Sequence, residues 1–179
     1  MSVFFLLRGH DEALQEQRGL PAGVSLQVWR PHEEAALPLS SLDPLRAAVW
    51  LQDRCGLFAD GRYTELSVWR GAVRIHRLIV TPRWHRFPFM APGDLQIGGL
   101  WTDARWRRKG IARWTIDRAH RLFAAPGQRF WYVTDSDNGA SKSFAEAAGY
   151  RLVGEGSRTK PAGIALLGQF RLEKRLADI

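Results

Sequence analysis

The chain has 179 residues, enough for one domain with a sizeable core and too few for two domains of ordinary size. Hydrophobic residues make up 45% and charged residues 25% of the composition, as in a soluble globular protein. No apolar run approaches the roughly 20 residues that span a bilayer, and the first residues lack the pattern of a signal peptide. We therefore expect a cytoplasmic protein.

The net charge of +8 favours an anionic partner, which could be nucleic acid, a membrane surface, or a phosphorylated cofactor or substrate. The one cysteine, Cys55, excludes an internal disulfide and a cysteine-based metal site. Its helical spacing from Leu51 predicts a buried side chain rather than a nucleophile. We expect no metal site.

The first half of the chain predicts strands, one helix and a hairpin. Residues 9–23 read as a polar helix or loop, and a helix begins near residue 41 with Ser41 or Asp43 as its N-cap. Residues 83–93 form a loop rich in proline and aromatic residues, which either covers the edge of the core or lines a substrate site. The expected strands are 3–7, 24–29, 63–69 and 73–82, the last two joined as an antiparallel hairpin by a turn at 70–72.

The second half predicts two strand-helix units and a closing strand pair. A strand at 94–102, with a bulge or close backbone approach at Gly98-Gly99, leads into a basic loop and a helix of about fourteen residues. A short apolar strand at 130–134 leads into a second helix capped by Asn138. Strands at 151–153 and 164–172 follow, joined by a polar loop at 155–163. This order is an α/β pattern with a mostly antiparallel start and a strand-helix-strand unit in the middle.

Basic residues and a glycine fall where the strand at 94–102 gives way to a helix. Unpaired N–H groups in a first helical turn, together with the helix dipole, favour a phosphate there, and Gly110 allows close approach of the main chain. The spacing Arg107-x-x-Gly110-x-Ala112 resembles the [Gln/Arg]-x-x-Gly-x-[Gly/Ala] loop with which the GNAT acetyltransferase superfamily holds the pyrophosphate of acetyl-coenzyme A. Arg108 and Lys109 add positive charge to the same loop.

A second pattern supports the first. Asn138-x-x-Ser141, followed by Gly149-Tyr150, resembles the other GNAT signature at full length and without a gap. Each pattern follows a strand and opens a helix, and about 25 residues lie between them, as one helical crossover requires. Their agreement in type, order and separation identifies the chain as a GNAT-like protein.

The resemblance is best over residues 62–172. It implies one GNAT-like domain over residues 1–179, in which 1–61 form an N-terminal strand and helix region and 62–179 form the cofactor-binding core. The implied fold is α/β (α+β), with a mixed, mostly antiparallel central sheet and helices on both faces.

The resemblance also implies the chemistry: direct transfer of an acetyl group from acetyl-coenzyme A to a primary amine of a small molecule, such as an amino sugar. The cofactor's pantetheine arm would pair with the main chain at 100–102, where this strand splays from its neighbour. Asn138 is equally explained as a helix cap, and Lys142 as a solvated lysine. The residues implied to bind the cofactor are Leu100, Trp101, Thr102, Arg107, Arg108, Lys109, Gly110, Ile111, Ala112, Asn138, Ser141 and Lys142.

The family's usual proton donor is missing. Many members carry a tyrosine four residues after the serine, at the position of Ala145, and alanine has no proton to give. Tyr132 and Tyr150 are close in sequence, although both are simply explained as core aromatics with a hydroxyl at the surface.

The general base is also open. Gln96 occupies the position where many relatives have a glutamate, and an amide can orient a water or substrate but takes no proton. Asp94 on the same strand face and His76 on the hairpin are the remaining candidates, with His85 behind them. We expect His120 to be a solvated surface residue. The candidate catalytic residues are therefore Asp94, Gln96 and His76.

Two alternatives remain. Ala145 and Gln96 are compatible with an acyl-coenzyme A binding protein that transfers nothing. The net charge, with Trp84, Trp101, Trp106 and Trp114 lying among arginines, suits a nucleic-acid-binding domain whose aromatic side chains stack on bases. Against the latter, the basic residues concentrate at a loop with its own phosphate explanation. We expect a small-molecule amine as partner and neither nucleic acid nor membrane, with a homodimer left open.

Overall fold

The computed structural model describes residues 2–9, 19–36, 44–161 and 168–176. Its helices are α1 (Pro44–Arg54), α2 (Ile111–Leu122) and α3 (Gly139–Ala147). Its strands are β1 (Ser2–Gly9), β2 (Ser25–Trp29), β3 (Thr64–Arg70), β4 (Val73–Pro82), β5 (Leu95–Thr102), β6 (Arg129–Asp135), β7 (Arg151–Arg158) and β8 (Phe170–Arg175).

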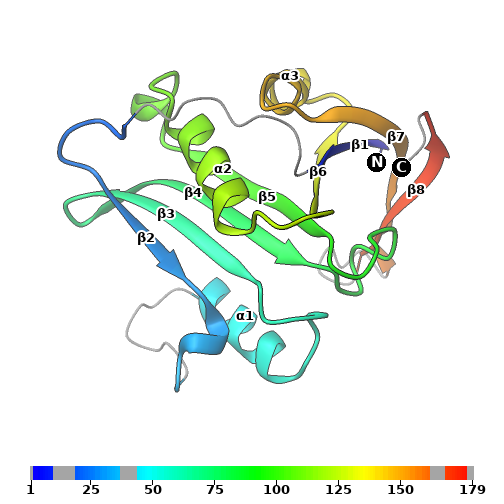
Figure 1. Cartoon of the computed structure of the whole chain (residues 1–179), viewed down its shortest axis with the longest axis horizontal. Helices are drawn as coiled ribbons and strands as arrows, with labels where there is room; N and C mark the ends of the chain where they lie inside the picture. The colour runs from blue at the N-terminus through cyan, green and yellow to red at the C-terminus, as the bar shows by residue number, and fades with distance from the viewer. Residues whose placement is uncertain (1, 10–18, 37–43, 162–167, 177–179) are drawn as a thin grey trace.

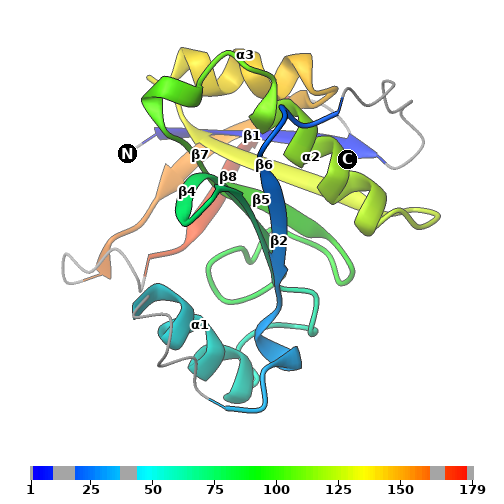
Figure 2. The same cartoon turned by 90° about the vertical axis from the view of Figure 1, so that its left-hand side faces the viewer.

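The strands form one sheet in the order β2-β3-β4-β5-β6-β1-β7-β8 (Figure 1). The pair β5–β6 is parallel, and the other described neighbours pair antiparallel. Helices α2 and α3 lie on one side of the sheet and α1 on the other (Figure 2). The expected mixed, mostly antiparallel sheet with helices on both faces is confirmed.

Strand β1 lies in the interior of the sheet. It pairs antiparallel with β6 from Val3–Asp135 to Gly9–Arg129, and with β7 from Ser2–Ser157 to Leu7–Arg151. A strand here was expected, but nothing in the local sequence indicated its neighbours β6 and β7, which lie in the second half of the chain.

One prediction about β7 was wrong. The polar segment expected to form a loop after residue 154 continues the strand to Arg158, paired with β1 and β8. The prediction failed because glycine is uncommon inside strands. Here glycine allows close packing, since a Cβ on Gly156 would lie 1.8 Å from the carbonyl oxygen of Arg171. The expected N-cap at Ser41 or Asp43 and the start of the last strand lie outside the described residues, as does most of 9–23.

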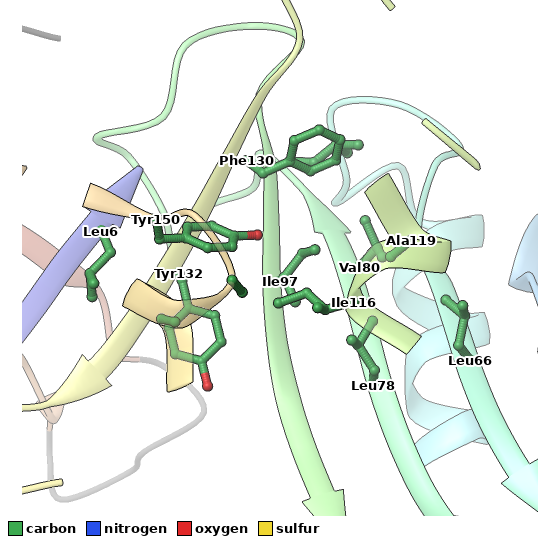
Figure 3. Packing of buried hydrophobic residues seen from close by; sticks show 13 residues of the cluster. Leu6, Leu66, Leu78, Val80, Ile97, Ile116, Ala119, Phe130, Tyr132 and Tyr150 are labelled. Atoms are coloured by element: carbon green, nitrogen blue, oxygen red, sulfur yellow. The ribbon is translucent and has the colours of Figure 1, made fainter. Parts of the chain in front are cut away.

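The main core lies between the sheet and the two helices α2 and α3 (Figure 3). Side chains alternate along a strand, so Ile97 of β5 joins this core while its neighbour Gln96 faces α1. Each fully buried Leu, Ile or Phe contributes about 1.5–3 kcal/mol. The labelled members are Leu6, Leu66, Leu78, Val80, Ile97, Ile116, Ala119, Phe130, Tyr132 and Tyr150.

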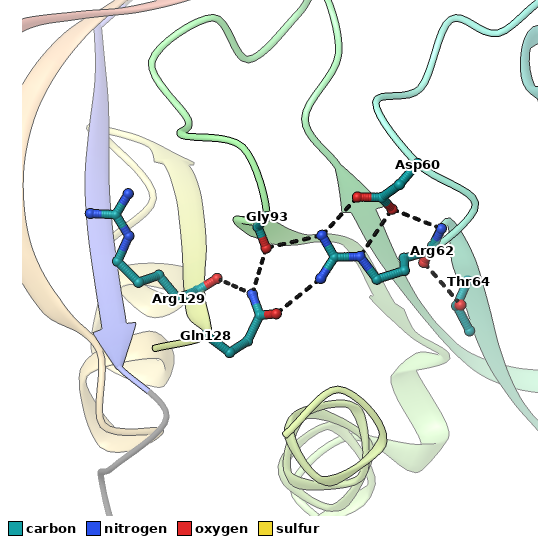
Figure 4. A network of polar contacts seen from close by, with 6 residues as sticks. All are labelled: Asp60, Arg62, Thr64, Gly93, Gln128 and Arg129. Atoms are coloured by element: carbon teal, nitrogen blue, oxygen red, sulfur yellow. Dashed lines mark hydrogen bonds and ion pairs between the residues drawn. The ribbon is translucent and has the colours of Figure 1, made fainter. Parts of the chain in front are cut away.

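Hydrogen bonds tie together three loops at the end of the sheet where β5 and β6 begin (Figure 4). The guanidinium of Arg62 donates to Asp60 Oδ2 (2.7 Å), to the carbonyl oxygen of Gly93 (3.0 Å) and to Gln128 Oε1 (3.0 Å). Gln128 Nε2 donates to the same Gly93 carbonyl (2.9 Å). The starts of β5 and β6 are therefore held at a fixed separation.

Two expectations about single residues were wrong. Cys55 is exposed, because α1 ends at Arg54 and leaves the cysteine in the following turn, beyond the buried stripe of the helix. His120, expected at the surface, is buried beside Tyr150, whose hydroxyl lies 2.8 Å from its Nε2. Arg8 approaches its other ring nitrogen at 3.1 Å, so the polar ring has partners on both sides within the core.

Among the described helices, none is long and apolar enough to cross a membrane. The described His, Cys, Asp and Glu side chains form no group of three or more that could hold a metal ion.

Candidate active site

The parallel strands β5 and β6 separate soon after they begin. Their ladder covers only the segment from Leu95–Phe130 to Ile97–Tyr132. Beyond it β5 continues to Thr102 against β4, and β6 continues to Asp135 against β1. Each strand therefore has one main-chain edge that faces the other strand without pairing to it. Backbone N–H and C=O groups require partners, so this gap suits a ligand that carries amide groups.

A bulge lies where the ladder stops. The register of β4 against β5 shifts between Arg77 and Ile79, opposite the two glycines of β5. Gly99 has φ +58°, and a Cβ there would lie 2.7 Å from Ile79 Cδ1. Only glycine fits this backbone without strain, and a bulge bends its strand, which directs β5 away from β6.

The basic loop after β5 has an unusual backbone. Asp103 caps a 3-10 turn at Ala104–Trp106 by accepting a hydrogen bond from the N–H of Arg105 (2.9 Å). Arg108 then has φ +60° and Gly110 has φ +77°. A left-handed arginine costs about 1–2 kcal/mol, and backbone strain of this kind clusters at functional sites.

The loop is accessible to an anion. Arg107, Arg108, Lys109 and Gly110 are exposed, and α2 begins directly after them with Ile111. The first N–H groups of a helix have no acceptor within it, and left-handed positions next to them make a concave row of donors. A Cβ at Gly110 would meet no atom within 4 Å, so the space in front of the loop is open. These residues fit a pyrophosphate.

Trp106 organises positive charge beside the loop. The ammonium of Lys109 lies 4.5 Å from the centroid of its ring, and the guanidinium carbon of Arg70 lies 5.2 Å from it. Arg107 Nε donates to the carbonyl oxygen of Thr102 (3.2 Å), which joins the loop to the end of β5. Arg70 was not among the residues predicted to bind the cofactor, because it belongs to the β3–β4 hairpin, which is distant from this loop in the sequence.

The start of α3 lies near the same gap. Asn138 Oδ1 accepts a hydrogen bond from the N–H of Ser141 (3.0 Å), so the side chain is a helix cap. Lys142 lies 3.8 Å from a carboxylate oxygen of Glu146, one turn along its own helix. At 100–102 Trp101 is the exposed member of the strand, and Leu100 and Thr102 are half-buried.

Tyr132 brings a phenol to this turn. Its hydroxyl lies 3.0 Å from Ser141 Oγ, and the side chain is buried, as expected for a core aromatic. Burial raises the pKa of the Tyr132 hydroxyl, although the hydrogen bond with Ser141 lowers it in part. The phenol therefore keeps its proton at neutral pH. Position 145, where the family's usual tyrosine is missing, is a buried alanine of the same core cluster.

His76 is held inside the core. Its Nδ1 lies 2.7 Å from Thr102 Oγ1 and its Nε2 lies 2.8 Å from Thr115 Oγ1. Burial lowers the pKa of His76 to about 4, so the ring is neutral at pH 7 and a weak base. It links β4 to β5 and α2, which favours a structural role over a catalytic one.

Asp94 is also fully engaged. Its carboxylate accepts hydrogen bonds from Arg129 Nε (2.8 Å), Arg129 Nη2 (3.0 Å), Trp131 Nε1 (2.7 Å) and the N–H of Ala91 (2.9 Å). These contacts fasten the end of the aromatic loop to β6. The geometry gives Asp94 an anchoring role.

Gln96 differs from the other two candidates, because it lines a pocket. Its Nε2 donates to the carbonyl oxygen of Ile97 (2.8 Å), and the side-chain amide lies against the backbone of Gly98 in the pocket lining. Asp94, Gln96 and His76 are thus not brought together into one catalytic group.

This α1-side pocket has a volume of about 320 Å³ and lies across the sheet from α2 and α3. One part of its lining, formed by the glycines of the bulge and Val133 of β6 and called the inner end below, lies at the β5–β6 gap. Of the residues that line the pocket, the sequence analysis had singled out only Gln96, the two glycines and the aromatic loop. The other lining residues come from segments that are far apart in the sequence. The lining residues are Leu45, Ala48, Val49, Gln52, Phe58, Tyr63, Ile79, Thr81, Trp84, Arg86, Phe87, Gln96, Gly98, Gly99, Val133 and Phe170.

The aromatic loop at 83–93 packs on the core and also lines the α1-side pocket. Phe87 and Met90 pack in a core cluster with Phe5 and Trp131. Trp84, Arg86 and Phe87 line the α1-side pocket. His85 of the same loop is exposed and lies outside that lining.

Two strands separate beside a basic loop and a second helix start, which is the arrangement that the two sequence patterns predict. The acetyltransferase (GNAT) family matches residues 55–150, and the chain belongs to this family, whose members generally use acetyl-coenzyme A. No curated protein matches the sequence.

Solved structures share the fold at low identity. A tandem GNAT protein from the clavulanic acid biosynthesis pathway is 14% identical, with a TM-score of 0.58 over 84% of this chain and 50% of that one. A Drosophila protein is 14% identical, with a TM-score of 0.57 over 86% and 48%. A GNAT-family protein from Novosphingobium aromaticivorans is 16% identical, with a TM-score of 0.55 over 87% and 62%. The matched part is thus half to three-fifths of their length.

Proposed function

We propose that this protein is an acetyl-coenzyme A-dependent N-acetyltransferase that modifies a primary amine of a small molecule. The observation that carries the proposal is the β5–β6 gap, which lies between the basic loop and α3 on one side and the α1-side pocket on the other. A site for a cofactor and a site for an acceptor therefore meet at unpaired main-chain edges. Such an arrangement supports catalysis by orientation of two reactants.

The cofactor side would be held mainly by main chain. Arg107, Lys109 and the first turn of α2 would bind the pyrophosphate, and the open edge of β5 at 100–102 would bind the pantetheine amides. When bound, acetyl-coenzyme A supplies the acetyl group as a reactive thioester. Main-chain N–H groups beside the bulge can hydrogen-bond to the acceptor or to a carbonyl oxygen in the gap.

Proton transfer would fall to Tyr132 and Ser141. Tyr132 Oη carries a proton at neutral pH, and Ser141 Oγ, 3.0 Å away, can return one to it from solvent. This pair would replace the tyrosine that Ala145 lacks. The hydroxyl would then reach the gap from β6 rather than from α3.

The described residues that line the α1-side pocket include no carboxylate and no histidine. We propose that the amine enters in its neutral form, with Gln96 orienting it. The value of kcat/KM should then rise with pH until the amine's own pKa is passed, without a plateau set by an enzyme base.

The proposal is tested by mixing the protein with acetyl-coenzyme A and a panel of primary amines. Free thiol is followed over time, and mass spectrometry of the products identifies the N-acetyl amide. A reaction without amine measures background hydrolysis. Tight coenzyme A binding with no acetylation of any amine would instead establish an acyl-coenzyme A binding protein.

We also propose that nucleic acid is not a partner. Of the four tryptophans that could stack on bases, Trp101 is exposed and Trp84, Trp106 and Trp114 are half-buried. Binding to DNA or RNA that falls steeply with salt and that acetyl-coenzyme A does not displace would contradict this.

A further inference from the structure

Two buried hydrogen-bond donors in the aromatic loop lack acceptors. Trp84 Nε1 and Arg86 Nε have no partner among the described residues, and both side chains line the α1-side pocket. Buried polar groups in folded proteins are nearly always paired, so each exception requires an explanation. Of the buried unpaired side-chain atoms among the described residues, only these two belong to residues that line this pocket, so a ligand bound there is the candidate acceptor.

The guanidinium of Arg86 is held in place by its surroundings. The carbonyl oxygen of Arg86 accepts a hydrogen bond from the N–H of Phe170 in β8 (2.9 Å). Its guanidinium carbon lies 5.6 Å from the centroid of the Phe170 ring and 5.8 Å from that of Trp84. Stacking on two aromatic rings orients the planar group and leaves its N–H groups to contact a ligand.

The electrostatics of this wall favour an anion. Arg86 is the one charged side chain among the described residues that line the pocket. The guanidinium carbon of Arg158 lies 5.3 Å from the Phe170 ring, and burial together with the charge of Arg158 lowers the pKa of Arg86. A negative group beside Arg86 would offset both effects.

The rest of the pocket suits an apolar body of limited size. Five aromatic side chains line it, and its volume of about 320 Å³ lies at the lower end of the roughly 300–1,000 Å³ range of ligand pockets. This size and the single charge favour a small acceptor over a nucleotide-linked one. The aromatic residues are Phe58, Tyr63, Trp84, Phe87 and Phe170.

We propose that the acceptor is a small aminocarboxylate with an apolar or aromatic body. Its carboxylate binds Arg86 and the indole N–H of Trp84, and its amine lies at the inner end of the pocket beside Gly98 and Gly99. A planar carboxylate matches the fork of one guanidinium, which gives the contact both strength and direction. This inference rests on the proposed transferase function and specifies its substrate class.

The binding test needs no cofactor. Calorimetry compares carboxylates with their neutral amides across several bodies, for example 3-phenylpropanoate with 3-phenylpropanamide and 4-methylpentanoate with its amide. The carboxylate should bind about 10–100-fold more tightly, as expected for a charge-assisted hydrogen bond. Arg86→Met should abolish this preference, and Arg86→Lys should keep part of it because the charge remains.

Arg83→Met is the matched control. Arg83 belongs to the same loop but lines a different pocket, so its variant should keep the carboxylate preference. Circular dichroism and thermal unfolding verify that each variant is folded. Equal affinity for acid and amide in every pair, or a preference unchanged in folded Arg86→Met, would overturn the proposal.

An activity assay separates this inference from the function on which it rests. Phenylalanine is compared with its amide, and 4-(aminomethyl)benzoate with benzylamine, as acetyl acceptors. Equal acetylation with and without the carboxylate would overturn the inference and leave the transferase function standing. Carboxylate binding that depends on Arg86, with no acetylation of any amine, would leave the anion site standing and reject the transferase function.

Discussion

The two sides of the β5–β6 gap are built in different ways. On the helix side, the basic loop and the start of α3, which we propose bind the cofactor, each consist of a few consecutive residues. On the α1 side, the pocket is assembled from α1, β4, β5, β6, β8 and two loops. A site built from the main chain at a helix start can be predicted from a short sequence pattern. A site built from side chains of distant segments cannot, because only folding brings those segments together.

The two sides also depend on different buried polar groups. The helix side contains two buried histidines that are neutral at pH 7: His76 of β4, which contacts Thr115 of α2, and His120, which belongs to α2 itself. The α1 side contains an ion pair in which Glu65 Oε1, on a side chain that is 1% exposed, accepts from Arg46 of α1 (2.7 Å). The two sides should therefore respond to different perturbations.

A fall in pH should destabilise the protein through the helix side, and this is the largest expected effect on the free energy of unfolding. Burial lowers the pKa of His76 to about 4, and burial with the charges of Arg8 and Arg113 lowers that of His120 to about 3. Both folded-state values lie below the unfolded value, so the stabilisation is complete above about pH 6.5 and is lost as pH falls toward the folded values. Each histidine should cost about 2 kcal/mol between pH 7 and pH 5, or about 4 kcal/mol together.

Urea unfolding at pH 7, 6 and 5 measures this loss. His76→Gln should remove about half of the pH dependence, because one of the two titrating groups is gone. A free energy of unfolding that stays flat over this range would contradict the burial of neutral histidines.

Loss of the buried ion pair should destabilise the α1 side of the protein. Glu65→Gln leaves Arg46 without its carboxylate and should destabilise the protein by about 3 kcal/mol, the lower part of the range for one partner removed from a buried pair. Coenzyme A affinity should change little, because the helix side is untouched. Chemical denaturation and calorimetry measure the two quantities.

Glu33→Gln is the control for this variant, since Glu33 forms an exposed pair with Arg30. Its stability should equal that of the wild type within error. If Glu65→Gln weakened coenzyme A binding as much as it weakened folding, the two sides would not be independent.

Adding a side chain at Gly110 should weaken the binding of coenzyme A. Gly110→Val forces a branched residue to φ +77° and places it in the open space before the row of N–H groups, so coenzyme A affinity should fall about 10–100-fold. Gly127→Val provides a matched comparison, because Gly127 has φ +72° and also has no atom within 4 Å of a Cβ. Both variants should lose similar stability, and calorimetry should detect the affinity loss only at Gly110.

The smallest expected effect concerns proton transfer. Tyr132→Phe should lower kcat about tenfold, less than a typical general acid contributes because a thiolate leaves readily, with the KM for acetyl-coenzyme A unchanged. Tyr150→Phe removes a buried hydroxyl from the same core cluster, where its partner is His120, and should leave kcat near that of the wild type. Equal effects of the two variants would remove Tyr132 from the mechanism.

The sequence predicted the backbone geometry of the helix side well and the α1 side poorly, for physical reasons. Gly110 and Asn138 have functions that depend on local backbone geometry, and their positions at helix starts are confirmed. Arg86 and Phe170 meet through long-range packing that leaves no local pattern. His120 was misjudged because its polar ring is satisfied by Arg8 and Tyr150, both distant in sequence.

The interior position of β1 has a consequence for how the chain folds. Strands β2 to β5 are neighbours in sequence as well as in the sheet, so they can pair early at a small entropic cost. Strand β1 must instead be inserted between β6 and β7, whose residues are far along the chain. Until that insertion, both of those strands expose unpaired edges, which are the edges most able to accept a strand from another molecule. Refolding should therefore be slowest, and aggregation fastest, at the step that places β1.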